Sequence, residues 1–265
     1  MIKRLKKIGS PYFHSLKRSF YKGKNIYLIY TMGKVGSASI YTSLKRMKPY
    51  SAIFHVHFLS RHWLVDTLPT MHQYFHSNIT LGEEILAYIE KHPQKRIKII
   101  TLVREPVARA VSELFQNWQA SYQNIMEVDD QQLIDRLARN DFGYTLDWFD
   151  TEFKAYTGVD IFSLDFDREK GYASYSFDKL DILCIKLEKL NEVAEESISS
   201  FIDMPFKLIG ANQSKHKFSS QKYQAIKDNL KIEPQGLDRL YESKLVQHFY
   251  TPEEIRRFKL KWGKH

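Results

Sequence analysis

The run Lys24–Thr31 (KNIYLIYT) decides the fold class of this chain. It is rich in β-branched and aromatic residues and does not alternate with polar ones, which predicts a strand that is buried on both faces. Met32–Gly36 contains two glycines and predicts a tight loop. Ser37–Met47 then repeats apolar residues at helical spacing. The chain therefore begins its folded part with a strand, a glycine loop and a helix.

The same pattern recurs along the chain. Further strands are predicted over Ser51–Val56, Arg96–Val103 and Ile182–Leu187. Helices are predicted over Leu81–His92, Glu105–Trp118, residues 130–157 and Glu188–Ile202, with two or three more in the last 45 residues. Buried strands separated by helices indicate a parallel sheet. We predict an α/β fold: a single P-loop-like domain over residues 25–265, with a mostly parallel sheet flanked by helices and a helical C-terminal elaboration.

Composition and charge exclude several classes of protein. The chain has 265 residues and is 43% hydrophobic, which excludes a disordered protein. Its one cysteine, Cys184, excludes an intrachain disulfide and a thiolate zinc cluster. The net charge is +9, but residues 1–24 hold eight basic and no acidic side chains, whereas the rest holds 32 basic and 31 acidic ones. A nucleic-acid-binding domain carries basic charge on its folded surface, so we expect no nucleic-acid partner.

Residues 1–24 form a basic N-terminal arm that leaves two alternatives open. Apolar residues lie among its lysines, a pattern compatible with contact to an anionic membrane surface. The other alternative is a solvated tail that leads into the first strand. Gly9, Ser10 and Pro11 interrupt its apolar residues, which argues against a secretory signal. We predict a cytoplasmic protein, with peripheral contact to the inner face of the membrane as the open alternative.

The loop after the first strand predicts a phosphate site. Its residues are Gly33, Lys34, Val35, Gly36, Ser37, Ala38 and Ser39. Glycines let the backbone approach an anion, and the free N–H groups at a helix start point toward it. A Walker A loop has its lysine directly after the second glycine, whereas Lys34 precedes Gly36. The alternative is a plain glycine turn between strand and helix.

A second motif follows the strand Arg96–Val103. Arg104 lies at the carboxyl end of this strand, where open α/β sheets bind ligands, and Ser112 lies about two turns into the next helix. An arginine and a serine in this arrangement can bind a second phosphate. For Arg109 we expect a capping or ion-pair role instead.

These two motifs resemble those of sulfotransferases. The KVGSAS segment from Lys34 is similar to their 5′-phosphosulfate loop, and Arg104–Ser112 is similar to their 3′-phosphate motif. The loop spacing resembles that of uronyl 2-O-sulfotransferases. The whole chain, including residues 248–255, also resembles bacterial capsular polysaccharide synthesis proteins of the sulfotransferase-like clan, and residues 182–190 resemble a later strand of that clan. Sulfotransferases use 3′-phosphoadenosine 5′-phosphosulfate (PAPS).

The resemblance implies a role for each motif. Lys34 would contact the bridging oxygen, and the loop from Gly33 to Ser39 would wrap the 5′-phosphate. Arg104 and Ser112 would hold the 3′-phosphate, and the polar segment 212–217 would close over the nucleotide. Relatives usually have proline where this chain has Gly33, which implies a more mobile entry to the loop.

Two histidines are candidates for a general base. His55 and His57 share one face of the strand that ends near Val56. The 2-O-sulfotransferases carry a similar pair, with the second histidine as base, so His57 is the first candidate and His55 the second. Both could instead be core histidines, in which case Asp66 or Glu83 is the next candidate. A metal site drawing on His55, His57, His62, His72 and His76 is a weaker alternative.

We therefore predict a sulfotransferase that moves a sulfuryl group from PAPS to a saccharide or glycolipid acceptor in bacterial capsular or surface polysaccharide synthesis, with no metal. One alternative is a metal-dependent glycosyltransferase that uses Asp165 and Asp167, although this pair reads as an exposed turn. Another is a non-catalytic anion-binding scaffold. The aromatic residues Trp118, Tyr122, Trp148 and Phe149 fit the core better than a sugar platform.

Overall fold

A five-stranded sheet organises the protein. The computed structural model describes residues 21–117, 124–210 and 220–264, so most of the basic arm and the segment 212–217 lie outside the described residues. The strands run in the order β2-β1-β3-β5-β4. Their bounds are β1 Asn25–Tyr30, β2 Ala52–Val56, β3 Arg96–Val103, β4 Tyr172–Ser176 and β5 Leu180–Lys186.

Four of the strands are parallel, which confirms the prediction of a mostly parallel sheet. β1 pairs in parallel with β2 and β3, and β3 pairs in parallel with β5. β4 is the exception, because it pairs antiparallel with β5 at the edge of the sheet. The sequence analysis missed β4, whose segment YASYS is half-exposed to exposed and lacks the apolar run of the other strands.

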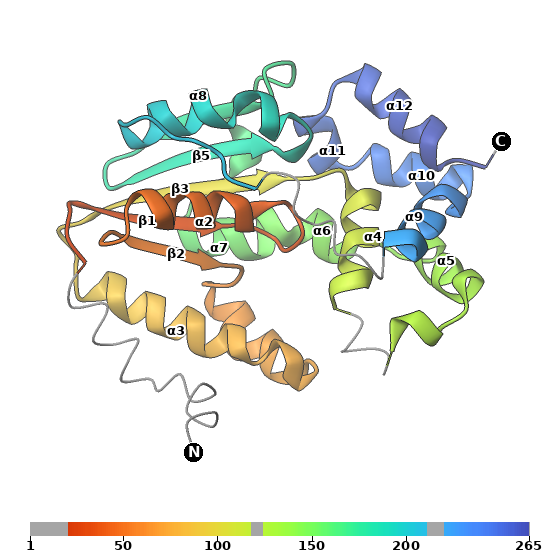
Figure 1. Cartoon of the computed structure of the whole chain (residues 1–265), viewed down its shortest axis with the longest axis horizontal. Helices are drawn as coiled ribbons and strands as arrows, with labels where there is room; N and C mark the ends of the chain where they lie inside the picture. Colours follow the sequence, from red (N-terminus) through yellow and green to blue (C-terminus); the bar gives the residue numbers. More distant parts are fainter. Residues whose placement is uncertain (1–20, 118–123, 211–219, 265) are drawn as a thin grey trace.

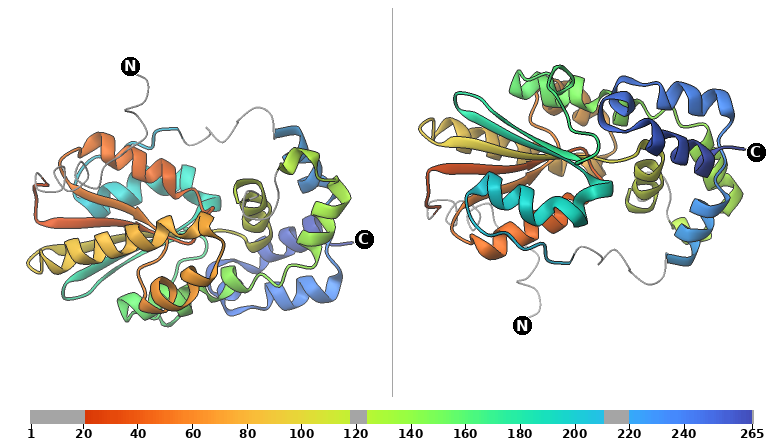
Figure 2. Two further views of the ribbon diagram at one scale, coloured as in Figure 1. Left: turned by 90° about the horizontal axis from the view of Figure 1, so that it is seen from below. Right: turned by 90° about the horizontal axis from the view of Figure 1, so that it is seen from above.

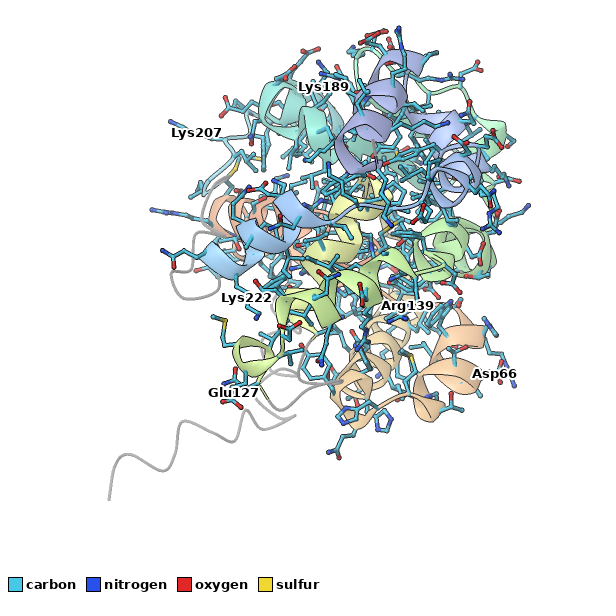
Figure 3. The ribbon with its side chains drawn as sticks, turned by 90° about the vertical axis from the view of Figure 1, so that its right-hand side faces the viewer. Asp66, Glu127, Arg139, Lys189, Lys207 and Lys222 are labelled. Carbon is cyan, nitrogen blue, oxygen red and sulfur yellow. The ribbon has the colours of Figure 1, made fainter. Side chains whose placement is uncertain are left out.

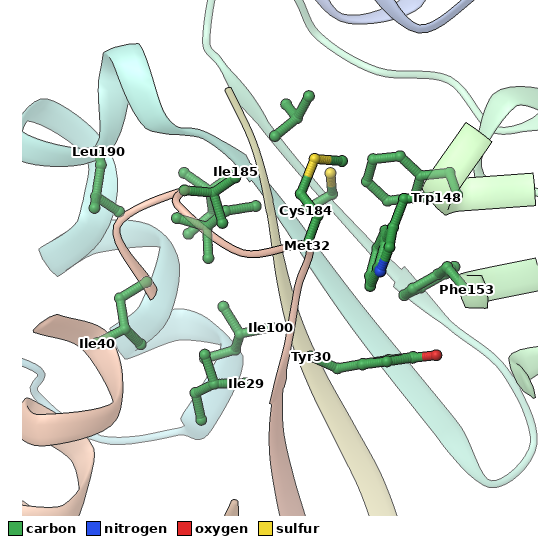
Figure 4. Close-up of a cluster of buried hydrophobic side chains, with 14 of the residues drawn as sticks. Ile29, Tyr30, Met32, Ile40, Ile100, Trp148, Phe153, Cys184, Ile185 and Leu190 are labelled. Atoms are coloured by element: carbon green, nitrogen blue, oxygen red, sulfur yellow. The ribbon is translucent and has the colours of Figure 1, made fainter. Parts of the chain in front are cut away.

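Helices cover both faces of the sheet. α2 (Ser37–Met47) and α8 (Leu190–Ile202) lie on one face. α3 (Ser77–Glu90) and the helical segment of α6 (Gly143–Trp148), η6 (Phe149–Lys154) and α7 (Ala155–Thr157) lie on the other. Figure 4 shows the two resulting cores, in which Ile29 points toward α2 while Tyr30 points toward Trp148 and Phe153. Burial on both faces explains why the strands do not alternate with polar residues.

A helical layer lies beyond the carboxyl ends of the strands (Figure 1). It contains α4 (Pro106–Gln116), α5 (Asp130–Ala138), α9 (Ser220–Asn229), α10 (Pro234–Tyr241), α11 (Lys244–Phe249) and α12 (Pro252–Trp262). The described residues thus contain four helices after residue 219, and the prediction of two or three was too low. α9 is held to α5 by Lys222, which is labelled in Figure 3 and donates to Asp130 and to the Val128 carbonyl.

A buried carboxylate fastens this layer to the sheet. Glu105 caps α4 by accepting from the backbone N–H groups of Val107 and Ala108 at 2.8 and 2.7 Å. It also accepts from Tyr241 Oη at 2.8 Å and Trp262 Nε1 at 3.2 Å. The C-terminal helices are therefore bonded to the residue that follows Arg104.

The segment between β2 and α3 consists of short turns: η1 (His62–Thr67), η2 (Leu68–Thr70) and η3 (Gln73–Phe75). None of the helices within the described ranges has both the length and the apolar character needed to cross a membrane.

Candidate functional site

The carboxyl ends of β1 and β3 form the centre of the site. From β1 the chain crosses to β2 on one side, and from β3 it continues to β5 on the other side. The order of the strands therefore reverses between β1 and β3, and such a switch point opens a crevice where α/β proteins bind ligands. The glycine loop leaves β1 at this point, and Arg104 leaves β3.

The glycine loop contains two residues with a positive φ. Gly36 has φ of +79°, and a Cβ atom added to it would lie 2.6 Å from Leu187 Cδ1. Lys34 also has a positive φ, of +71°, which is unusual for a residue with a side chain. In the described part of the chain no side chain caps the N-terminus of α2. Its first N–H groups are therefore available to an anion.

Two arginines donate hydrogen bonds to backbone carbonyl groups of this loop. Arg104 donates from Nη1 to the Lys34 carbonyl at 2.9 Å, and Arg109 donates from Nε to the Gly33 carbonyl at 3.0 Å. Arg109 is buried, and its two Nη atoms bind both carboxylate oxygens of Glu113 at 3.0 and 2.9 Å. The ion-pair role predicted for Arg109 is thus confirmed, and it carries an additional loop contact.

The loop separates two cavities. The loop cavity, of about 450 Å³, is lined by the loop, the start of α2 and both candidate histidines, with Ile209 and Gly210 on its far wall. The aromatic cavity, of about 610 Å³, is lined by residues of the 57–78 segment, α4 and Tyr144. The residues common to both walls are Gly33, Lys34, His57 and Gln116. A ligand in one cavity would therefore meet a ligand in the other at Lys34 and His57.

Lys34 points its ammonium group at this junction. Its Nζ donates to Gln116 Oε1, an uncharged partner. Burial lowers the pKa of Lys34 to about 8, and the guanidinium groups of Arg104 and Arg109 act in the same direction. Neighbouring charges neutralise the Lys34 ammonium group only weakly. An anionic ligand would supply the missing negative charge and is therefore well suited to this position.

His57 is held in one orientation. It follows β2, whose Val56 pairs with Tyr30, so the imidazole lies beside Thr31. Nδ1 is 2.7 Å from the Thr31 carbonyl oxygen, which can only accept, so Nδ1 carries the proton. Burial lowers the pKa of His57, as do Arg109 and Lys34, while the bond to Thr31 opposes the change. The neutral ring therefore has its lone pair on Nε2, the form that a general base needs.

His55 has a different environment. Its Nε2 is 2.8 Å from Ser37 Oγ at the start of α2, and its ring stacks on Tyr41 with centroids 5.6 Å apart. Burial lowers the pKa of His55 to about 3, with His57 contributing. The ring centroids of the two histidines are 5.0 Å apart. Since its Nε2 is occupied by Ser37, His55 is placed to orient the loop, whereas Nε2 of His57 has no hydrogen-bond partner among the described residues.

A buried carboxylate fixes the chain on the other side of His57. Glu152 accepts hydrogen bonds from Tyr30 Oη, from the N–H groups of Leu59 and Ser60, and from Ser60 Oγ. Trp148 Nε1 donates to the His57 carbonyl at 3.2 Å. The segment that carries His57 is thus anchored to η6 and α6 at several points.

The structure places the other predicted residues as follows. Ala38 and Ser39 line the loop cavity, whereas the side chain of Val35 is in the core. Ser112 is half-buried on α4, and neither it nor Arg104 lines the loop cavity or the aromatic cavity. Asp66 is paired with His62 at 3.7 Å, and Glu83 is exposed on α3.

The structure also describes some of the residues behind the alternative functions. Asp167 closes an exposed turn by accepting from the N–H groups of Glu169 and Lys170. Within the described ranges no three side chains of His, Cys, Asp or Glu are grouped as metal ligands. Trp148 and Phe149 are buried in the core, while Trp118 and Tyr122 lie outside the described residues.

Sequence reasoning missed the residues that complete the site from other segments. Gln116, Glu113 and Tyr144 have no motif of their own, and only the packing of α4 and α6 brings them to the loop. Phe58 and Trp63 were hidden in a segment with no clear periodicity. The short turns η1 to η3 were therefore not recognised as the wall of a cavity.

A comparison with known protein families gives a match to part of the chain. Residues 126–251 match the family model described as "Putative capsular polysaccharide synthesis protein". This part of the chain is similar to that family. The match covers β4, β5, α8 and α10, and it begins after Lys34, His57, Arg104 and Ser112, so it leaves the roles of those residues as predictions. The comparisons with curated proteins and with solved structures give no match.

Proposed function

We propose that this chain transfers a sulfuryl group from PAPS to a hydroxyl group of a carbohydrate, in the synthesis of a bacterial capsular or surface polysaccharide. The observation that carries the proposal is the meeting of Lys34 and His57 on the wall common to the two cavities. The similarity of residues 126–251 to a capsular polysaccharide synthesis family supports the biological setting.

The phosphates of the donor would lie in the loop cavity. The uncapped N–H groups of α2 and the hydroxyl group of Ser37 favour the 5′-phosphate there. Arg104 and Ser112 are proposed to meet the 3′-phosphate, as the resemblance implies. Arg104 already supports the loop through the Lys34 carbonyl, so the same residue would link the two phosphates.

The reaction would be an in-line displacement at sulfur. The acceptor oxygen forms a bond to sulfur while the bond from sulfur to the bridging phosphate oxygen breaks, and the electron pair of that bond leaves with 3′-phosphoadenosine 5′-phosphate. His57 Nε2 takes the proton of the acceptor hydroxyl group. The ammonium group of Lys34 stabilises the charge that develops on the leaving phosphate. Positioning and electrostatic stabilisation carry most of the rate enhancement in such transfers.

Nucleotide binding tests this proposal. We expect 3′-phosphoadenosine 5′-phosphate to bind at least about tenfold more tightly than ADP, which corresponds to about 1.4 kcal/mol. Arg104→Ala should remove most of this preference, whereas Arg139→Ala, at an exposed arginine that ends α5, should keep it. Equal affinity for the two nucleotides would reject the 3′-phosphate assignment.

The same titration separates the alternatives. Preferential binding of a UDP-sugar with Mn²⁺ would favour a glycosyltransferase and reject the proposal. Tight binding of 3′-phosphoadenosine 5′-phosphate without transfer from labelled PAPS to any polysaccharide would favour the anion-binding scaffold. If Arg104→Ala lost all nucleotide binding, the role of Arg104 would be to support the loop through the Lys34 carbonyl rather than to contact the 3′-phosphate.

A further inference from the structure

The aromatic cavity has a rigid apolar wall. Phe58 and Trp63 are stacked with centroids 4.7 Å apart and an angle of 27° between the rings. Tyr144 meets Trp63 edge to face, with centroids 5.5 Å apart. The Trp63 ring is fixed further by its Nε1, which donates to Thr151 Oγ1 at 3.4 Å. Such a preordered wall can stack on a flat apolar surface of a ligand without much loss of side-chain entropy.

Another part of the wall of the aromatic cavity is polar. It is made of amide, hydroxyl and carboxylate side chains: Thr67, Ser77, Asn78, Glu113, Gln116 and Asn117. A ligand with a single hydroxyl group, such as a simple phenol, would leave most of these groups without a partner from the ligand, which lowers its affinity. A sugar ring has both an apolar C–H face and an edge of hydroxyl groups. The two walls together therefore fit a sugar better than a purely aromatic ligand.

The charges around this cavity fit an uncharged sugar. Among the described residues, the lysine and arginine side chains that line it are Lys34 and Arg109. Arg109 is fully engaged, because its donors bind both oxygens of Glu113, the Gly33 carbonyl and Thr145 Oγ1. Lys34 lies at the junction with the loop cavity and bonds Gln116. Under the proposed function Lys34 contacts the donor phosphate, so with nucleotide bound a carboxylate on the sugar would find no free cation among the described lining residues and would face Glu113.

We propose that the aromatic cavity binds a neutral sugar unit of the acceptor, stacked on Trp63, and discriminates against uronate sugars. The inference rests on the proposed function, because an acceptor site has its meaning beside a donor site. It also departs from the resemblance to uronyl sulfotransferases, since the geometry favours a neutral sugar. The volume of about 610 Å³ lies in the range of small-ligand pockets and admits more than one sugar ring.

Titration calorimetry in the presence of saturating 3′-phosphoadenosine 5′-phosphate tests this inference, because the nucleotide then occupies Lys34. The probes are neutral trisaccharides of gluco, galacto and manno configuration, each paired with the uronate of the same linkage. We expect the best neutral probe to bind at least about tenfold more tightly than its uronate, which corresponds to about 1.4 kcal/mol. Equal or tighter binding of the uronate would overturn the charge argument, and no binding of any neutral probe would overturn the sugar site.

Variants locate the binding in the cavity. Trp63→Ala should weaken neutral sugar binding about tenfold or more, and Trp63→Phe should retain most of it because a ring remains. Tyr50→Ala, at an exposed aromatic residue that lines neither cavity, is the matched control and should bind as the wild type does. Binding that survives Trp63→Ala, with the thermal unfolding midpoint unchanged, would place the sugar elsewhere.

A charge variant and a nucleotide titration complete the test. Glu113→Gln should narrow the preference for neutral sugars, because it removes the repelling carboxylate and frees one edge of Arg109. An unchanged preference would contradict the role of this ion pair. Nucleotide affinity should be the same in wild type and Trp63→Ala. Sugar binding without binding of 3′-phosphoadenosine 5′-phosphate would reject the proposed function alone. Binding of 3′-phosphoadenosine 5′-phosphate without sugar binding would reject this inference alone.

Discussion

The affinity for 3′-phosphoadenosine 5′-phosphate should fall as the pH rises from 7 to 9, because Lys34 loses its proton in this range. The phosphates of the nucleotide are ionised above pH 7, because the second pKa of a phosphate group is about 6. Burial lowers the pKa of Lys34 to about 8, and the pKa of His57 lies below its usual 6.5. Lys34 is therefore the site group expected to titrate between pH 7 and 9.

The size of the effect follows from the pKa of the free protein. If the nucleotide binds only the charged form of Lys34, the apparent dissociation constant is divided by the charged fraction. With a pKa of about 8, this fraction falls from about nine tenths at pH 7 to about one eleventh at pH 9. The dissociation constant should thus rise by up to about tenfold over these two pH units, which corresponds to about 1.4 kcal/mol.

Calorimetric titrations at pH 7, 8 and 9 and constant ionic strength measure this dependence. Lys34→Arg is the control variant, because a guanidinium group keeps its charge over the whole range. Its dissociation constant should stay constant from pH 7 to 9. Lys34→Ala should bind weakly at every pH. A flat profile in the wild type, or the same rise in Lys34→Arg, would refute the assignment of Lys34 to the phosphate contact.

The remaining predictions concern the base, the loop and its support. His57→Ala should lower sulfuryl transfer from labelled PAPS to polysaccharide by about 10²–10⁴-fold with little change in nucleotide affinity, and His55→Ala should have the milder effect; the opposite order would exchange their roles. Gly36→Ala should reduce the free energy of unfolding in urea by about 1–2 kcal/mol or more, because of its positive φ and the nearby Leu187 side chain. Gly33→Ala, which has open space around it, should unfold like the wild type, and a similar loss in both variants would contradict this reasoning. Glu152→Gln should cost about 1–3 kcal/mol in the same assay, because an amide donor would face the donors that Glu152 now accepts from, and unchanged stability would argue against the anchor.

The fold was predictable where the apolar pattern was strong. The bounds predicted for α2 and β3 agree with the structure, and those for β1, β2 and β5 differ by no more than two residues at either end. These segments have long apolar runs or clear helical spacing, so local sequence and tertiary burial favour the same structure. β4 was missed because an exposed edge strand needs no apolar run.

The candidate site was predictable only in part. The loop that contains Lys34 was found because glycines after a buried strand have a specific use. The sequence also paired His55 with His57, but their unequal roles depend on the bonds to Ser37 and Thr31, which no local pattern encodes. The aromatic cavity was out of reach, because Tyr144 approaches Trp63 only after distant segments pack together.

The strand register is what turns these separate residues into one site. Parallel pairing of Tyr30 with Val56 sets His57 beside Thr31, and pairing of Ile29 with Ile100 brings the end of β3, and thus Arg104, up to the loop. A slip of one residue in β2 would exchange its two faces, so that a core residue would replace the imidazole at the junction of the cavities. Glu152 opposes such a slip, because it bonds Tyr30 at the end of β1 and also Ser60 beyond the end of β2. The same bonds that stabilise the sheet edge therefore keep the candidate base within reach of both cavities.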